Sequence, residues 1–174
     1  MTARDGKAMM AKSDWAAGLA SQRVEDKIAT LRTLANQDAV TGLAVACIKL
    51  VVDSDEEVRM WAAEALQRSV LPDVDDVETL AELVLYPNDG EIPYWAATML
   101  GRLQSEAVGG VEALQHCLLN SNYLPARERA AWALAQIGPA AANAIGSLEK
   151  AAPTAPPRLK QLVREAIQAI GNAA

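Results

Sequence analysis

The chain has 174 residues, a net charge of −6 and a pI near 4.8; 51% of its residues are hydrophobic, 4% are aromatic, and Phe is absent. This length suits one domain with a continuous core, and the 35 alanines with only scattered β-branched residues exclude a sheet-based fold and favour an all-α one. The acidic balance repels phosphate backbones and anionic lipid headgroups, so we expect no nucleic-acid partner and no membrane partner.

The N-terminal part of the sequence predicts a tail followed by a helix. Residues 1–12 have no helical pattern, and we expect them to be disordered. They also lack the apolar run of a signal peptide, which favours a cytoplasmic protein. Val24, Ile28 and Leu31 recur at helical spacing, so residues 21–35 are expected to form a capping helix.

A regular sequence repeat runs through the rest of the chain. Residues 58–66 read VRMWAAEAL, residues 92–100 read IPYWAATML, and residues 126–134 read ARERAAWAL, so the step between copies is constant. A fourth copy, LKQLVREAI at 159–167, continues the series and begins one position early. Such a period is typical of repeat proteins, in which each unit buries its apolar face against its neighbours.

Each repeat is expected to be a helical hairpin, because an apolar run precedes each copy and the copies themselves have helical periodicity. Ser54 followed by Glu57 has the form of a capping box at the start of a second helix. Gly138 and Gly171 each follow the last periodic residue of a second helix, where a left-handed residue is often required. We expect a single domain over residues 13–174, with repeats at about 38–69, 74–103, 107–138 and 141–171.

The best copy, LVVDSDEEVRMWAAEAL at residues 50–66, resembles the HEAT-repeat family, in particular the short HEAT-like repeats of phycobilisome lyases. The resemblance implies a right-handed α-α superhelix of about four hairpins plus the N-terminal capping helix. In that family an Asp in the turn and an Arg in the second helix often form a ladder between repeats; here they are Asp53 and Arg59. Tetratricopeptide repeats share the period and are the alternative fold, although their Trp, Gly-Tyr and Ala-x-x-x-Phe pattern is not met.

Reactive side chains are few, so we expect neither an enzyme nor a metal or cofactor site. His116 is the only histidine, and Cys47 and Cys117 lie in apolar helical runs two repeats apart. No Gly-rich phosphate loop or zinc-type cysteine spacing is present. The acidic clusters at 53–57 and 73–78 are interpreted as solvated carboxylates at helix starts, where they meet the positive end of the helix dipole.

The repeat register predicts a binding surface on the face of the second helices that lies opposite the core. In HEAT-like arrays these helices line the concave surface, and exposed aromatic residues there often mark binding sites. Trp61 and Trp95, at the edge of the core stripe, are expected to be half-buried. The predicted partner-binding residues are Met60, Glu64, Tyr94, Thr98, Trp132, Glu128 and Arg102, with Arg68 among the polar surroundings.

We therefore expect a non-catalytic scaffold that binds a protein partner through the concave helix face. Two enzymes of similar scaffold are the alternatives: a HEAT-like bilin lyase, which requires a tetrapyrrole, and an alkylpurine DNA glycosylase, which requires a basic groove. A third interpretation makes the repeats a structural piece whose ends stack on other chains, and the sequence leaves the oligomeric state open.

Overall fold

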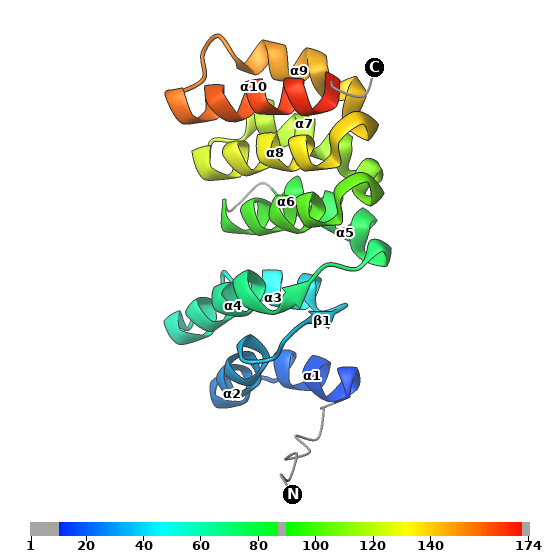
Figure 1. Ribbon diagram of the computed structural model, residues 1–174. Coiled ribbons are helices and arrows are strands. Elements are labelled where there is room, and N and C mark those ends of the chain that lie inside the picture. Colours follow the sequence, from blue (N-terminus) through cyan, green and yellow to red (C-terminus); the bar gives the residue numbers. More distant parts are fainter. Residues whose placement is uncertain (1–10, 87–89, 172–174) are drawn as a thin grey trace, which may run out of the picture.

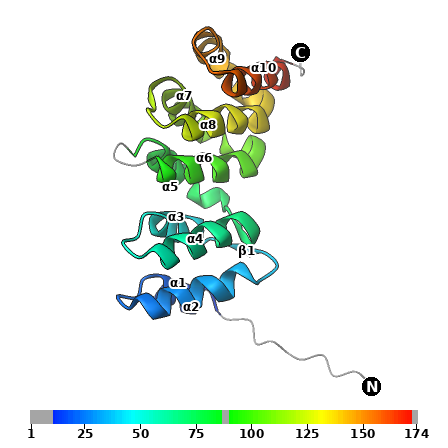
Figure 2. The same cartoon turned by 90° about the vertical axis from the view of Figure 1, so that its left-hand side faces the viewer.

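The computed structural model describes residues 11–86 and 90–171, which form five helical hairpins stacked along one axis (Figure 1). The first helices of the hairpins are α1 (Lys12–Leu19), α3 (Ala44–Leu50), α5 (Val77–Val84), α7 (Val111–Asn120) and α9 (Ile145–Ala151). The second helices are α2 (Val24–Ala35), α4 (Glu56–Arg68), α6 (Glu91–Leu103), α8 (Leu124–Ile137) and α10 (Pro157–Gly171). Figure 2 shows the same stacking order after a turn of 90°.

Short segments connect the hairpins. Two-residue strands β1 (Val40–Thr41) and β2 (Val70–Leu71) pair in parallel, with Val40 opposite Val70. Three 3₁₀ segments lead into the later first helices; they are η1 (Val74–Asp76), η2 (Gln104–Gly110) and η3 (Gly138–Ala144).

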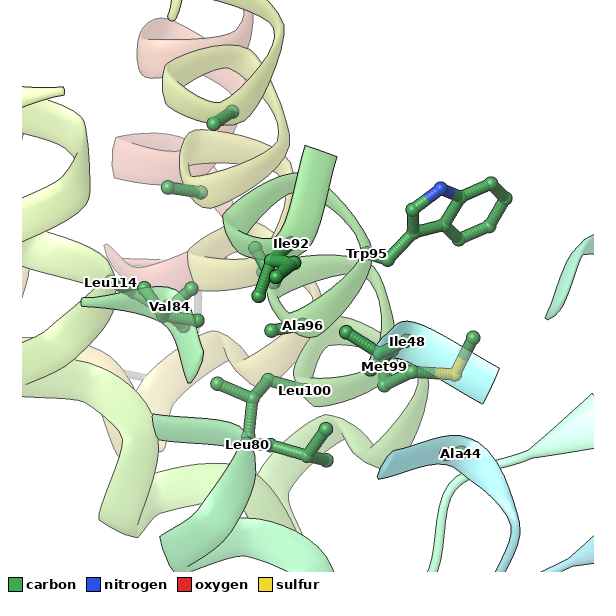
Figure 3. Close-up of a cluster of buried hydrophobic side chains, with 14 of the residues drawn as sticks. Ala44, Ile48, Leu80, Val84, Ile92, Trp95, Ala96, Met99, Leu100 and Leu114 are labelled. Carbon is green, nitrogen blue, oxygen red and sulfur yellow. The ribbon is translucent and has the colours of Figure 1, made fainter. Parts of the chain in front are cut away.

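The core follows the repeat register. Equivalent positions of the four copies are buried, beginning with the position held by Val58, Ile92, Ala126 and Leu159. The position four residues later is also buried in each copy, and three of its four residues are alanine. Small side chains at these points allow neighbouring helix axes to approach closely. The prediction of an all-α fold is confirmed. Figure 3 shows part of this core, where α6 packs on Leu80, Val84 and Leu114.

The N-terminal end of the stack is a pair of helices. The range in which a capping helix was expected contains α2, and α1 precedes it and packs against it. Trp15 and Leu19 of α1 are buried there. Lys12, the last residue of the expected tail, begins α1, whereas residues 1–10 lie outside the described residues.

The cap of α4 is Asp55, so the prediction of a capping box at Ser54 was wrong by one residue. The Asp55 carboxylate accepts hydrogen bonds from the backbone N–H groups of Glu57 at 2.9 Å and Val58 at 3.1 Å. A carboxylate satisfies the unpaired N–H groups at a helix start and also meets the positive end of the dipole. Asp73 caps η1 in the same way. These two acidic residues thus have structural roles.

The expected ladder between Asp53 and Arg59 takes a different form. Asp53 pairs with Lys27 of the preceding hairpin at 2.7 Å, and the two side chains are 10% and 19% exposed. Arg59 instead donates to the backbone carbonyls of Asp53 and Ser54. The hydrogen bond from Lys27 holds the pKa of Asp53 below its usual value, with help from the backbone N–H of Asp55. The ion pair joins the first two hairpins.

The Asp53 carboxylate is expected to stabilise the fold in a pH-dependent way. Because folding lowers its pKa, its contribution is present above the unfolded value and is lost as pH falls through the folded value. Asp53→Asn should lower the free energy of unfolding by about 1–2 kcal/mol at neutral pH, and the difference should shrink below a pH of about 4. Urea unfolding at several pH values measures this.

Glu25→Gln is the control, because the ion pair of Glu25 with Arg23 is long and exposed. A difference for Asp53→Asn that stays constant down to acid pH would contradict the assignment.

The ends of α6 and α8 share an uncommon backbone conformation. Gln104 has φ 54° and ψ −135°, and Gly138, one period later, has φ 65° and ψ −137°. The expectation of a left-handed residue is confirmed at Gly138 but is wrong at Gly171, which is the last residue of α10 and has no positive φ. A side chain is strained at such a φ, whereas glycine adopts it readily. Gln104 therefore carries strain that its counterpart avoids.

Gln104→Gly should stabilise the protein by up to about 1–2 kcal/mol, because relief of strain exceeds the extra entropy of glycine in the unfolded chain. Thermal unfolding should show a midpoint raised by a few degrees, at about 2–4 °C per kcal/mol for a chain of this size. The reciprocal change Gly138→Gln should destabilise the protein by about 1–3 kcal/mol through the backbone, since an added Cβ at Gly138 meets no atom within 4 Å. A lower midpoint for Gln104→Gly would contradict this account.

The row of second helices is interrupted between α4 and α6. α2 packs on α4, and α6 and α10 both pack on α8, but α6 contacts the second hairpin mainly through α3. Figures 1 and 2 both show a wider space between α4 and α6 than between α6 and α8. The stack thus has two blocks on this side, and a groove lined by Met60 of α4 and Trp95 of α6 lies between them.

Candidate functional site

The surface formed by α2, α4, α6, α8 and α10 is called the second-helix face below. Its aromatic cluster is built from Tyr94 of α6 and Arg129 and Trp132 of α8. The Arg129 guanidinium carbon lies 4.9 Å from the centroids of both rings, and its Nη2 donates to the Tyr94 hydroxyl at 2.7 Å. Cation–π contacts of this kind hold aromatic rings in one orientation.

Trp132 rests on a glycine of the neighbouring helix. A Cβ atom added to Gly101 would lie 2.4 Å from the Trp132 ring and 3.1 Å from the Ala133 Cα. The ring therefore occupies the space that a side chain at position 101 would fill. From the sequence, Trp132 could either contact a partner or be covered by a neighbouring helix or by the N-terminal segment that holds Trp15. In the structure, α6 covers one side of its ring. Trp15 is buried in α1, within the first hairpin.

The predicted exposed ridge is only partly correct. Thr98 was expected on the surface, but it is 5% exposed, and its hydroxyl donates to the Tyr94 carbonyl in its own helix. Thr98 and Gly101 share the side of α6 that α8 approaches closely, because residues three apart lie on one face. Tyr94 and Trp132 are half-buried for the same reason. The repeat register alone did not reveal how near α8 would lie.

Met60 is the most exposed of the predicted residues, with 53% of its surface accessible. Glu64, one turn further along α4, is half-buried and pairs with Arg68 at 3.1 Å. Trp61 is half-buried as expected; it donates to Glu57 and lies under the Arg32 guanidinium at 5.1 Å.

Trp95 is more deeply buried than expected, with 8% of its surface exposed. Figure 3 shows its indole pointing away from the other labelled side chains, out of the core of α6. Tyr94 meets this ring edge-on, with centroids 5.3 Å apart.

Arg102, one of the predicted partner-binding residues, has a structural role. Its Nη1 donates to the carbonyl of Leu66 in the last turn of α4 at 2.6 Å and to that of Val70 in β2 at 3.3 Å, and its Nη2 donates to the carbonyl of Gln67 in α4 at 3.3 Å. Carbonyls in the last turn of a helix lack partners within the helix, and a cation there meets the negative end of the dipole. Burial and the neighbouring Arg129 cation lower the pKa of Arg102. Arg102 thus joins α6 to α4 across the interruption.

A surface pocket of about 260 Å³ adjoins the aromatic cluster, and α10 closes one side of it. Glu128 and Arg158 form an ion pair of 3.3 Å across this pocket; the Glu128 side chain is 15% exposed and that of Arg158 is 77% exposed. The pocket is lined by Tyr94, Pro125, Glu128, Arg129, Trp132, Arg158 and Leu162.

Arg129 and Arg158 were not predicted as site residues. The repeat register could have pointed to Arg129, because Arg129 occupies the position held by Trp61 and Trp95 in the two preceding copies. Arg158 follows Pro157 in the first turn of α10, just after the segment where the repeat is one residue shorter. Flat aromatic faces beside guanidinium groups suit planar, aromatic or carboxylate groups of a ligand.

The remaining reactive side chains lie apart from this pocket. Cys47 and Cys117 are buried free thiols, and burial raises the pKa of Cys47 to about 12 and that of Cys117 to about 11. Both stay protonated and unreactive at neutral pH. In the two described ranges, no group of three or more His, Cys, Asp or Glu side chains is placed to hold a metal ion. No helix in these ranges has the length and apolarity needed to cross a bilayer.

Comparison with known proteins gives structural matches only. No protein-family model matches the chain, and no curated protein does. An engineered protein of the Northeast Structural Genomics Consortium is 24% identical, with a TM-score of 0.63 over 92% of this chain and 79% of its own. A second engineered protein from that consortium is 25% identical, with a TM-score of 0.62 over 90% of this chain and 46% of its own.

A designed armadillo repeat protein in complex with the peptide (KR)4 is 18% identical, with a TM-score of 0.60 over 90% of this chain and 80% of its own. The chain is an all-α helical repeat solenoid. At these identities the likeness to the three structures concerns the fold.

Gly101→Ala tests the packing that positions the aromatic cluster. The added methyl group should displace Trp132 from α6 and lower the free energy of unfolding of the solenoid by about 1–3 kcal/mol. Thermal unfolding and the NMR resonance of the Trp132 indole N–H measure the two effects.

Gly146→Ala in α9 is the matched control, because its added Cβ meets no atom within 4 Å. This control should gain about 0.5–1 kcal/mol from helix propensity. An unchanged Trp132 resonance in Gly101→Ala would contradict the proposed contact.

Proposed function

We propose that this solenoid is a non-catalytic scaffold that binds a protein or peptide through its second-helix face, with the Tyr94–Arg129–Trp132 cluster as the anchor. The observation that carries the proposal is the oriented pair of aromatic rings around Arg129, beside an open pocket. Aromatic and arginine side chains in a partly buried setting dominate the energy of many protein interfaces. Because the cluster is already held in place, little conformational entropy is lost when a partner binds.

Three further features support a binding role. One of the similar structures, the designed armadillo repeat protein, binds a peptide. Extended solenoid surfaces suit elongated partners because successive repeats present equivalent positions along one direction. The pocket is lined by aromatic rings and guanidinium groups, which suit binding and orienting a ligand. The two free thiols are buried elsewhere in the structure.

Two finer assignments belong to the same proposal. We propose the HEAT-like type for these repeats, on the resemblance of residues 50–66 and on the Asp53 that joins two hairpins through Lys27. We also propose the cytoplasm as the compartment, since free buried thiols such as Cys47 and Cys117 suit a reducing environment.

The test is affinity capture from an extract of the native cells, followed by quantitative mass spectrometry. Proteins enriched by the wild-type chain should be lost with the double variant Tyr94→Ala and Trp132→Ala. This variant also loses packing on Gly101, so Arg158→Glu is used alongside it: Arg158 is exposed at the same pocket. We expect Arg158→Glu to reduce capture while lowering the free energy of unfolding by about 1 kcal/mol, through loss of the ion pair with Glu128.

Arg164→Glu is the matched control, because Arg164 is an exposed arginine of α10 outside the pocket. It should capture the same proteins as the wild-type chain. Equal recovery of every protein with wild type, the double variant and Arg158→Glu would contradict the proposal.

A further inference from the structure

The interruption between α4 and α6 leaves a surface groove of about 610 Å³. Arg102 of α6 joins the C-terminal ends of the two helices by donating to the carbonyls of Leu66 and Gln67 in the last turn of α4. The groove opens at the other end, where α4 and α6 begin. Its lining combines apolar and charged side chains, namely Val51, Val52, Asp53, Glu56, Arg59, Met60, Ala63, Glu91 and Trp95.

Met60 lies at the centre of this region. It also lines two adjoining surface pockets, one toward α2 and one over the start of α4. A methionine that is 53% exposed offers a flexible, polarisable apolar surface that adapts to different partners. Trp95 lines the groove opposite Met60 as a second apolar surface.

Carboxylates surround this apolar centre. Glu56 is exposed on the first turn of α4, and Glu91 stands on the first turn of α6 and accepts a hydrogen bond from Tyr123. Arg59, the only cation among the described residues that line the groove, donates to the carbonyls of its own turn. Asp55 and Glu57 extend the acidic rim into the adjoining pocket.

Acidic residues are also concentrated in the N-terminal part of the solenoid, which contributes most of the groove lining. Residues 11–86 contain seven Lys and Arg against fourteen Asp and Glu, a net charge of −7, whereas residues 90–171 contain seven against six, a net charge of +1. A groove with walls of one sign concentrates ligands of the opposite sign. The N-terminal block therefore attracts cations, although the protein as a whole is only moderately acidic.

We infer that the α4–α6 groove binds a basic segment of a partner protein, with an apolar side chain of the segment on Met60 and Trp95 and a Lys or Arg facing Glu56 and Glu91. Lys and Arg suit this arrangement because their aliphatic stems cover apolar surface while their charged ends reach the acidic rim. The inference rests on the proposed binding function but assigns the partner's chemistry at a second part of the second-helix face, away from the Tyr94–Arg129–Trp132 cluster.

The experiment uses the full chain and a short fluorescein-labelled peptide of alternating Lys and Leu, with the Glu and Leu peptide for comparison. Fluorescence anisotropy should show binding of the basic peptide that weakens as salt is raised, and no binding of the acidic one. Glu56→Lys and Met60→Ser should each weaken binding at least about fivefold, through the charge and through the apolar contact respectively. Glu149→Lys, the same charge change on α9, should weaken it less than about twofold.

Methyl-labelled methionine locates the peptide directly. The Met60 methyl resonance, assigned from Met60→Ser, should shift on titration, whereas that of the fully buried Met99 serves as the internal reference. The double variant Tyr94→Ala and Trp132→Ala should leave the Met60 shift intact, so loss of cellular capture and loss of groove binding are separate results.

Three outcomes would overturn the inference. The first is equal weakening by Glu56→Lys and Glu149→Lys, which would indicate attraction to overall charge. The second is an unshifted Met60 methyl at saturating peptide. The third is tighter binding by the full chain carrying Arg4→Glu and Lys7→Glu but not by the chain carrying Lys150→Glu and Lys160→Glu, the same charge change on α9 and α10, which would identify the chain's own N-terminal segment as the occupant.

Discussion

Close approach of neighbouring second helices is the constraint on which this solenoid depends. A single hairpin cannot bury its apolar stripe, so each repeat must share its core with the next. Alanines at equivalent positions, such as Ala62, Ala96 and Ala130, remove the side-chain bulk that would keep the helices apart. Gly101 goes further and admits the Trp132 ring against the backbone of α6. The seam between α6 and α8 is therefore both a structural joint and the support of the aromatic cluster.

The joint between α4 and α6 lacks this close approach. Here the two second helices stay apart, and α6 packs against α3 instead. Arg102 of α6 bridges one end of the space by donating hydrogen bonds to the carbonyls of Leu66 and Val70. Hydrogen bonds from Arg102 and an open groove thus replace direct packing between these two second helices. The two surfaces most suited to binding thus arise from the closest and from the widest approach of adjacent second helices.

Charge follows this division of the stack. The block before the groove is strongly acidic, and the block after it is close to neutral with arginines at its pocket. A partner with a basic segment and a planar or acidic group would meet complementary chemistry along one direction of the face. The ion pair of Lys27 with Asp53 and the stacking of Arg32 on Trp61 bind the first two hairpins into the acidic block. Its charges are held on a rigid support.

Much of the fold was determined by the sequence itself, because helical periodicity and a constant repeat spacing can be identified directly from the order of the residues. The same register placed Val58 in the core and Met60 on the surface, and it located Gly138 at a turn that requires a left-handed residue. It did not place Thr98 or Trp95 correctly, it gave no prediction for Arg129, and it treated every repeat joint as alike. How far a side chain is covered depends on the spacing of the neighbouring helix axes, and that spacing results from contacts between residues distant in the chain. Only the tertiary structure could therefore decide that α8 covers Thr98 and that α4 and α6 leave a groove.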